Sequence, residues 1–424
     1  MANSQNESDG ELSAASAGHA NGTWPGMKKI SQMESPNEGA NAKTWLIGAL
    51  KERGQDLICQ PWPNGFGRLG ILAYQWDGSA MGMKTVNPNA DDTGNDASAV
   101  AWLITDVNGD RADEICQVID FDGTGHDVRI IVYGLQGGQI VTIGHHSQTG
   151  HGTPATAWLS GNICHPKGFK RSICQVWNYA SSVGMTIWDW TEDSEGGEME
   201  AIWNSFNVSS VERADASLAW LIGDVNGDGQ DEVIQVYEFE SHVAMIVYGW
   251  IGDAQNGHME VISSKHGVIG NSDSTSAVSW QIGDIDGDKK AEVIQMFENQ
   301  DGTALRAAVF GWKAEEGQMD FITHNLDLTE GPRALSWHIG DFNGDEKMEI
   351  CQLWKNDIGM LGMAVYGWVG GNIEEIWRGD MAVFADALSW LAGDINGDSH
   401  AEICQQVQDG DGNLKIIVYG SAAT

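Results

Sequence analysis

Acidic and amide side chains recur at fixed intervals in five short stretches of this sequence. Each stretch has Asp at position 1, Asn or Asp at position 3, Gly at position 4, Asp at position 5 and Glu at position 9. The oxygen-bearing residues are Asp106, Asn108, Asp110 and Glu114; Asp224, Asn226, Asp228 and Glu232; Asp284, Asp286, Asp288 and Glu292; Asp341, Asn343, Asp345 and Glu349; and Asp394, Asn396, Asp398 and Glu402. Oxygens at this spacing on a tight loop converge on one point, as cation coordination requires.

Calcium is the cation that these loops favour, because it is a hard ion that takes roughly 6–8 oxygen ligands. The backbone carbonyl at position 7 is a further candidate ligand, from Ala112, Gln230, Lys290, Lys347 or His400. Mg²⁺ is a weaker candidate because it prefers a smaller octahedral site that retains water. Zinc does not fit, since no paired His or Cys accompanies the carboxylates. A metal-free Asn-Gly or Asp-Gly turn is the alternative, but five copies in register favour the ion.

The loops belong to a repeat that occurs seven times along the chain. Each copy starts with a Trp phrase such as Trp220-Leu-Ile-Gly, and the Trp positions are 45, 102, 158, 220, 280, 337 and 390. A spacing of 53 to 62 residues with short β-branched and aromatic runs is typical of a propeller blade. In the fourth copy we expect strands at 218–222, 232–237, 244–250 and 258–263. The sequence therefore predicts an all-β, seven-bladed β-propeller of four-stranded blades.

The two ends of the chain predict how the ring closes. The last copy stops after its third strand, at 416–419, whereas the segment 27–33 precedes the first Trp phrase and resembles a fourth strand. We expect this N-terminal strand to pair with the last blade, which removes an open sheet edge. Residues 1–20 are then a disordered leader, and residues 21–424 form a single propeller domain.

Copies one and three lack the acidic loop. The first reads Ala49-Leu-Lys51-Glu-Arg53, and the third reads Asn162-Ile-Cys164-His165-Pro166. Lys51 and Arg53 bring positive charge to the place where an ion would lie. We therefore expect these two blades to hold their turns without metal, which leaves open whether they mark a functional site.

The amino-acid composition limits the kinds of molecule that this protein could bind. The chain has 60 acidic residues against 23 Lys plus Arg, a net charge of −37, which excludes a general nucleic-acid binder. No run of 18 or more apolar residues predicts membrane insertion. Residues 1–40 lack the pattern of a secretory signal, which leaves a cytoplasmic protein, a trimmed signal or non-classical export. Five cysteines share the position that is Ile in copies four and five, which indicates buried free thiols: Cys59, Cys116, Cys174, Cys351 and Cys404.

The acidic loop followed by an apolar strand resembles the FG-GAP (VCBS-type) repeats of integrin α-subunit propellers and their bacterial and fungal relatives. The resemblance covers residues 27–420 and implies calcium between the first two strands of a blade, on one face of the ring. The sequence departs from that family at position 9, where it has Glu and Asp is usual. The Phe-Gly…Gly-Ala-Pro phrase is not evident. The sequence also resembles fungal seven-bladed integrin-like lectins in its expected architecture. The sugar-binding phrases of those lectins are not evident in this sequence.

Two sets of residues lie outside the metal loops. A Gln follows the Cys/Ile position in every copy, and we expect it to bond from blade to blade; a ring of amides around a central channel is the alternative. Trp24, Trp62 and four further Trp residues fall outside the repeated Trp positions, where exposed aromatic rings can contact a sugar or a protein partner. The candidate ligand-binding residues are Trp177, Trp203, Trp354 and Trp377.

No catalytic signature is present, so we expect a non-enzymatic, calcium-stabilised recognition module. Its glycan or protein ligand would bind to the loops on the face opposite the calcium loops, because those loops vary most between copies. One alternative is an enzyme of the polysaccharide lyase or small-molecule cyclase type with its site in the central funnel. An off-pattern His, Tyr or carboxylate there would favour it. Another is a receptor-binding toxin or adhesin component. The sequence sets no oligomeric state.

Overall fold

The structure is a computed structural model that describes residues 24–35, 42–51, 54–63, 68–78, 83–85, 98–121, 127–149, 154–165, 168–193, 196–209, 216–265, 277–298, 305–329 and 334–421. The predicted leader at residues 1–20 lies outside these ranges. Within them the regular structure is built of β-strands, and no helix is long and apolar enough to cross a membrane.

The strands form six hydrogen-bonded sheets, five with four strands and one with eight. The eight-stranded sheet consists of two sets of four that meet at a single parallel pair, Gly197 with Gly144. Each set of four strands is called a unit here, and units are numbered along the chain.

Units 1 to 3 are β2 (Leu46–Gly48), β3 (Leu57–Pro63), β4 (Leu69–Trp76) and β5 (Met83–Thr85); β6 (Ala101–Thr105), β7 (Glu114–Asp120), β8 (Asp127–Gln136) and β9 (Gln139–Thr149); and β10 (Ala155–Gly161), β11 (Ser172–Tyr179), β12 (Ser182–Asp193) and β13 (Gly196–Ser209). Units 4 and 5 are β14 (Ser217–Gly223), β15 (Glu232–Phe239), β16 (His242–Ile251) and β17 (His258–Lys265); and β18 (Ala277–Gly283), β19 (Glu292–Glu298), β20 (Leu305–Lys313) and β21 (Gln318–Thr329). Units 6 and 7 are β22 (Ala334–Gly340), β23 (Glu349–Lys355), β24 (Met360–Val369) and β25 (Asn372–Phe384); and β26 (Ser389–Gly393), β27 (Glu402–Gln408), β28 (Leu414–Ser421) and β1 (Met27–Ser35).

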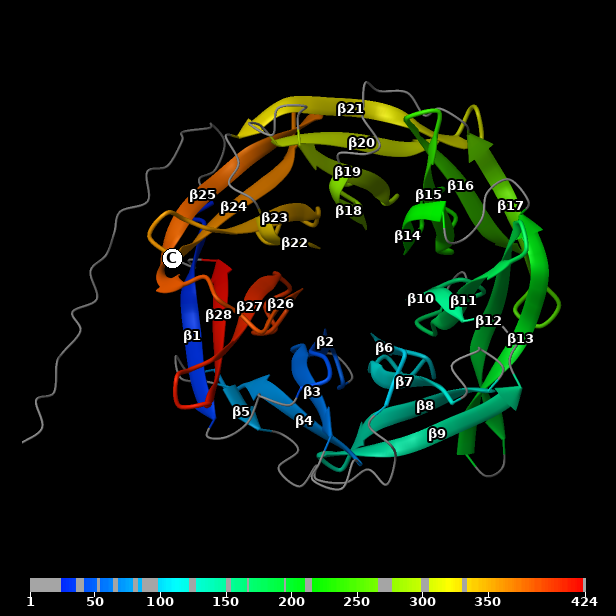
Figure 1. The fold of residues 1–424 in the computed structure, drawn as a ribbon, viewed down its shortest axis with the longest axis horizontal. Coiled ribbons are helices and arrows are strands. Elements are labelled where there is room, and N and C mark those ends of the chain that lie inside the picture. Colours follow the sequence, from blue (N-terminus) through cyan, green and yellow to red (C-terminus); the bar gives the residue numbers. More distant parts are fainter. Residues whose placement is uncertain are drawn as a thin grey trace, which may run out of the picture.

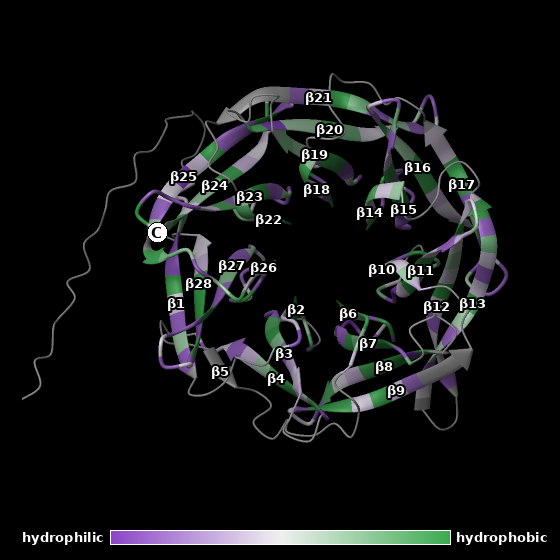
Figure 2. Ribbon diagram, viewed as in Figure 1, coloured by the Kyte–Doolittle hydropathy of each residue, from purple (hydrophilic) through white to green (hydrophobic). Residues whose placement is uncertain are grey.

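The units are arranged around a common axis, with the first strand of each nearest the axis and the fourth at the perimeter (Figure 1). This arrangement is that of a β-propeller. The second and third strands are buried along most of their length, because neighbouring units cover both of their faces. Along the perimeter strands, hydrophobic and hydrophilic residues are mixed (Figure 2), as expected for strands with one face in solvent.

The N-terminal strand completes the last sheet, as the sequence predicts. β1 pairs antiparallel with β28 from Met27–Ser421 to Ser35–Leu414, in the order β1-β28-β27-β26. Chain ends that are 394 residues apart in this register thus share one sheet, and the edge of β28 is covered.

A second set of contacts closes the ring at the loop after each first strand. The N–H group at position 8 of every loop donates to the carbonyl oxygen at position 1 of the preceding unit, at 2.7–2.9 Å. Asp56 of unit 1 donates to Asp394 of unit 7, so the contacts run around the whole ring. Each acidic loop is therefore held by its neighbours through the backbone.

Strand direction defines two faces. Because consecutive strands are antiparallel, the loops between first and second strands lie on one side of the ring, which we call the loop face. The turns between second and third strands, and the starts of the first strands, lie on the other side, which we call the opposite face.

Core residues largely follow the sequence expectation. All six cysteines are free and buried. The repeated Gln is different: its side chain accepts a hydrogen bond from a third-strand Tyr of the same unit, at 2.6–2.9 Å, in units 1, 2, 4, 6 and 7. The expected blade-to-blade bond occurs at Gln405, whose Nε2 donates to the Phe384 carbonyl on β25 of unit 6 at 2.9 Å, while the side-chain oxygen of the same Gln bonds within its own unit.

Candidate metal centres

The acidic loops turn twice through the left-handed region of backbone conformation. The position-4 glycines have φ between 78° and 82°, as the sequence implies: Gly109, Gly227, Gly287, Gly344 and Gly397. Position 6 is also left-handed, with φ between 68° and 87°, at Arg111, Gly229, Lys289, Glu346 and Ser399. Residues other than glycine keep this conformation only when surrounding contacts fix it. The sequence pattern does not mark this second turn, because position 6 is Arg, Gly, Lys, Glu or Ser.

Hydrogen bonds to the loop backbone supply those contacts. In unit 4 the Asp224 carboxylate accepts from the N–H groups of Gly227 and Gly229, at 2.7 and 2.9 Å. The side-chain oxygens at positions 3 and 5 accept from the N–H groups at positions 5 and 7, both at 2.8 Å. The same four bonds occur in the other acidic loops, at 2.6–3.0 Å. The oxygens at positions 1, 3 and 5 are thereby held on one side of the loop.

The Glu at position 9 lies under the loop and is 0–3% exposed in all five units. Its Oε2 accepts from the N–H group at position 2, at 2.8–3.1 Å. In units 5 and 6, donor oxygens of three acidic residues lie within 4.8 Å of one another: Asp284, Asp286 and Glu292, and Asp341, Asp345 and Glu349. The loops therefore gather carboxylates around a buried one.

Burial, reinforced by the neighbouring carboxylates, raises the pKa of each position-9 Glu to about 8. A divalent cation among these oxygens would offset the repulsion and keep the Glu ionised. The donors in these five loops are hard oxygens, so they fit Ca²⁺ or Mg²⁺ better than a thiophilic metal. At position 7 the N–H group is fixed by the position-5 carboxylate, and the carbonyl of each such residue stays a predicted ligand.

A glycine on the third strand makes room for the buried Glu. The third-strand residue beside position 9 is Gly134, Gly249, Gly311, Gly367 or Gly420 in the five acidic units. A Cβ added at Gly420 would lie 2.9 Å from Cγ of Glu402, and one at Gly367 would lie 3.4 Å from Cγ of Glu349. The sequence carries this signal as a repeated Tyr-Gly or Phe-Gly pair, but only the strand register relates the glycine to the Glu.

Units 1 and 3 reverse this arrangement. Position 9 is Leu57 or Ser172, and the third-strand residue beside it is Gln75 or Asp189. A lysine ammonium completes each arrangement. Lys51 Nζ donates to Gln75 Oε1 at 2.7 Å.

In unit 3, Lys170 Nζ donates to Asp189 Oδ2 at 2.9 Å. In unit 1, the positive charge expected at the loop is supplied by Lys51. The other expected positive residue of that loop, Arg53, lies outside the described residues.

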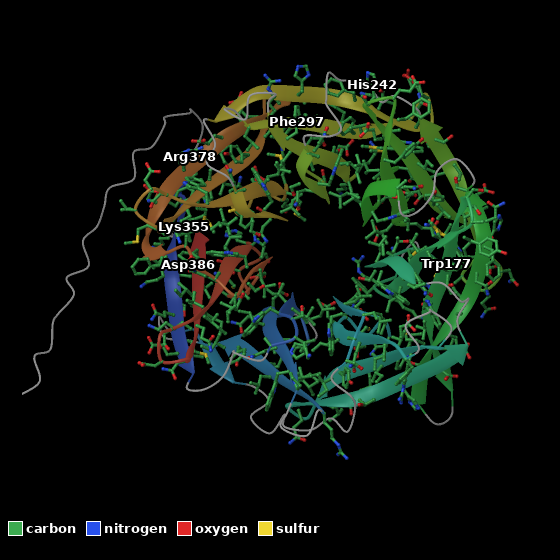
Figure 3. The ribbon with its side chains drawn as sticks, in the orientation of Figure 1. Trp177, His242, Phe297, Lys355, Arg378 and Asp386 are labelled. Atoms are coloured by element: carbon green, nitrogen blue, oxygen red, sulfur yellow. The ribbon has the colours of Figure 1, made fainter. Side chains whose placement is uncertain are left out.

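Two of the four candidate ligand-binding Trp residues are core residues, which corrects the sequence prediction. Trp177 is 1% exposed and Trp354 is 5% exposed, so neither ring offers a free face. Each lies opposite a glycine, Gly184 or Gly362, whose missing side chain leaves room for the indole. Trp177 lies within the wall of the ring (Figure 3). Both follow the repeated Gln by two residues, a position that is buried in units 2 to 6.

Trp203 and Trp377 lie on the perimeter strands β13 and β25 and are partly exposed. Trp203 packs edge-on against Trp250, with ring centroids 6.3 Å apart, and Trp377 packs against Trp24 at 6.1 Å. These two remain candidate ligand contacts.

No protein-family model and no curated protein matches this sequence. Among solved structures, the rhamnogalacturonan lyase YesW is 15% identical with a TM-score of 0.44, covering 94% of this chain and 75% of that one. Sqt1 of Saccharomyces cerevisiae is 10% identical with a TM-score of 0.47, covering 94% and 100%. The Nup133 β-propeller domain of Vanderwaltozyma polyspora is 11% identical with a TM-score of 0.46, covering 88% and 99%. Likenesses this distant support no inference about ligand or activity.

Proposed function

We propose that this chain is a seven-bladed β-propeller that binds Ca²⁺ at its five acidic loops and recognises a glycan or protein ligand on its opposite face, without catalysis. The seven units are its blades. The buried glutamates, the left-handed loop backbone and the glycine beside each Glu support the calcium sites. The resemblance to FG-GAP (VCBS-type) repeats supports the same assignment. Calcium holds the ring, and the ligand binds elsewhere.

The distribution of exposed hydrophobic side chains carries the proposal. Among the described residues, fifteen large hydrophobic residues are 38–75% exposed. Four are on the loop face: Phe169, Ile251, Met348 and Val369. Eleven are on the opposite face: Val100, Phe121, Tyr179, Phe206, Leu218, Phe239, Val278, Leu335, Ile358, Phe384 and Leu388. Exposed apolar residues that gather on one face mark an interaction surface.

Five of these residues occupy one repeated position, two residues before the repeated Trp. We call them the collar: Val100, Leu218, Val278, Leu335 and Leu388, which are 39–57% exposed. In units 4 to 6 the collar residue lies at a shift in register between the first and second strands. Such bulges redirect a side chain out of the sheet. Units 1 and 3 carry Lys43 and Thr156 at this position, so the collar is interrupted at the two units without acidic loops.

The collar favours a protein ligand over a glycan. Its side chains are aliphatic and 39–57% exposed, so burying the remaining surface of each would contribute about 0.7–1.5 kcal/mol against an apolar partner. Sugar recognition relies more on aromatic rings, which here means Trp203 and Trp377. The collar residues start the strands nearest the ring axis, so they can bind one ligand together.

The test is ligand selection with two matched variants. One replaces Leu218, Leu335 and Leu388 by Ser, and the other replaces Ile251 and Val369 on the loop face by Ser. A displayed peptide library and a glycan array are probed with Ca²⁺ present. We expect peptides whose binding is lost in the collar variant and kept in the loop-face variant. Ligands that the collar variant retains in full, or a folded protein that binds neither peptide nor glycan, would contradict the proposal.

One observation favours the enzyme alternative. His338 on the inner strand β22 stands where five other units have Leu: Leu46, Leu103, Leu159, Leu221 and Leu391. Burial lowers the pKa of His338 to about 4, so its imidazole is neutral at physiological pH. Its Nε2 lies 2.8 Å from the Ser336 hydroxyl oxygen. Release of unsaturated sugar products from a polysaccharide panel, lost in His338→Leu, would establish a lyase instead of a recognition module.

A further inference from the structure

The loop of unit 3 replaces the oxygen donors with softer ones. Cys164 and His165 follow β10, and Asp189 belongs to β12. One donor atom from each of these residues lies within 4.8 Å of the other two. His165 Nε2 lies 3.0 and 3.2 Å from the two carboxylate oxygens of Asp189.

The cluster lies at the position of the acidic sites in the other units. Asp189 is the register equivalent of the third-strand glycine, and Ser172 is the equivalent of the position-9 Glu. The carboxylate has therefore moved from the second strand to the third, while it stays at the same loop. Ser172 is fully buried, and its Oγ lies 3.0 Å from Cys164 Sγ.

Burial makes the cluster a defined site with a route to solvent. Cys164 is 2% exposed and the Asp189 side chain is 7% exposed, whereas the His165 side chain is 20% exposed. The other five cysteines lie on second strands within the apolar core, whereas Cys164 has polar neighbours. His165 is therefore the member of the cluster that is most exposed to solvent.

A thiolate, an imidazole and a carboxylate select Zn²⁺ over Ca²⁺, because thiolate and imidazole are poor ligands for calcium. At zinc bond lengths of roughly 2.0–2.3 Å, tetrahedral ligands lie about 3.4–3.6 Å from one another. The donor atoms of Cys164, His165 and Asp189 lie within 4.8 Å of one another, so small side-chain movements bring them to these separations. The Ser172 hydroxyl or a water molecule would complete four ligands.

Lys170 competes with a cation at this site. Its ammonium donates to Asp189 Oδ2 and to the Trp190 carbonyl, whereas Asp189 Oδ1 faces His165 Nε2, which is itself a proposed ligand atom. In unit 1 the equivalent ammonium of Lys51 contacts a neutral amide, with neither thiol nor imidazole in that loop. The two units therefore differ: unit 1 holds an ammonium, and unit 3 holds an ammonium beside three metal donors.

We propose that unit 3 binds one Zn²⁺ through Cys164, His165 and Asp189, with displacement of the Lys170 ammonium. Binding releases the thiol proton, and any proton on the imidazole, to solvent. Its three ligands belong to none of the five acidic loops, and it lies on the loop face, away from the ligand proposed for the opposite face.

The experiment is a metal titration of the full chain with Ca²⁺ at saturation, so that the acidic loops do not take up zinc. Zn²⁺ stoichiometry is measured by calorimetry, and Co²⁺ is used as a probe because a cobalt–thiolate bond gives a charge-transfer absorption. The variants are Cys164→Ser, Asp189→Asn and Lys170→Met. Cys351→Ile is the matched control, since units 4 and 5 carry Ile at that core position.

We expect one Zn²⁺ per chain and a thiolate absorption with Co²⁺, both retained in Cys351→Ile. Cys164→Ser should remove the absorption, and both ligand variants should weaken Zn²⁺ binding at least about 100-fold. Lys170→Met should bind Zn²⁺ more tightly, because the competing ammonium is gone. A thermal melt with Ca²⁺ verifies that each variant is folded. No zinc uptake by the folded protein and by Lys170→Met, or uptake that Cys164→Ser leaves unchanged, would overturn the proposal.

Discussion

Replacement of one buried glutamate should change the stability of the protein in opposite directions with and without calcium. Glu402 is 0% exposed, and its carboxylate accepts hydrogen bonds from the Ile395 N–H group at 2.8 Å and the Asn396 amide at 2.6 Å. Glu402→Gln keeps the size of the side chain and removes its charge. The variant therefore separates the electrostatic role of Glu402 from its packing.

The size of the effect follows from the pKa of Glu402, which burial raises from 4.5 to about 8. A carboxyl group with a raised pKa stabilises the fold below pH 4.5, and this contribution is lost as the pH rises to 8. A shift of this size corresponds to an upper bound of about 4–5 kcal/mol, which structural relaxation reduces to about 2–4 kcal/mol. Without divalent ions at pH 8, Glu402→Gln should be more stable than the parent by about this amount. With Ca²⁺ at about 10,000 times its Kd, loss of one site should cost about 5.4 kcal/mol. This cost exceeds the gain from removing the charge, so in Ca²⁺ the variant should be less stable than the parent by about 1–3 kcal/mol.

The assay is urea denaturation at pH 8, in EDTA and in saturating Ca²⁺. Glu238→Gln is the control, because Glu238 is exposed at the end of β15, away from the acidic loops. We expect the variant to unfold at higher urea than the parent in EDTA and at lower urea in Ca²⁺. The same order of stability under both conditions would refute this reasoning.

Three further substitutions test separate parts of the structure. Gly420→Ala should lower Ca²⁺ affinity at unit 7 about tenfold while Gly367→Ala changes little, as measured by calcium titration, because the added Cβ meets Glu402 Cγ at 2.9 Å in unit 7 and the equivalent Glu at 3.4 Å in unit 6. Burial lowers the pKa of His338 to about 4, so its contribution to the free energy of unfolding is fully present above the unfolded pKa of about 6.5 and is lost as the pH falls toward 4. In melts between pH 7 and 4, His338→Leu should therefore lose about 2–3 kcal/mol less stability than the parent. Lys289→Gly should raise the thermal midpoint in Ca²⁺ by relieving a φ of 70°, worth about 1 kcal/mol, and a lower midpoint would contradict the backbone argument.

Repetition explains how much of the fold could be predicted from the sequence. The fourth copy was expected to contain strands at 218–222, 232–237, 244–250 and 258–263, and the structure has β14 to β17 over these residues. The pairing of β1 with β28 followed from a missing strand at one end and a spare one at the other. Both predictions depend on the repeated sequence pattern alone, and neither requires knowledge of how the side chains pack.

The errors and omissions concern three-dimensional neighbours. Trp177 and Trp354 were expected to be exposed because they fall outside the Trp phrase, yet the glycine on the adjacent strand leaves each indole a place in the core. The repeated Gln bonds to a tyrosine two strands from the ring axis, a pairing set by register. The exchange of the third-strand glycine for Gln75 or Asp189 was likewise apparent only when the strands were aligned.

The number of calcium ions bound per chain tests the central claim most directly. The protein is equilibrated with Ca²⁺, freed of unbound ions by gel filtration and analysed for metal, and a matched sample in EDTA is melted in parallel. We expect five Ca²⁺ per chain, because units 1 and 3 hold Lys51 and Lys170 in place of the oxygen set, and a lower melting temperature after chelation. A chain that retains no calcium, or one whose melting temperature is the same in EDTA, would contradict the account.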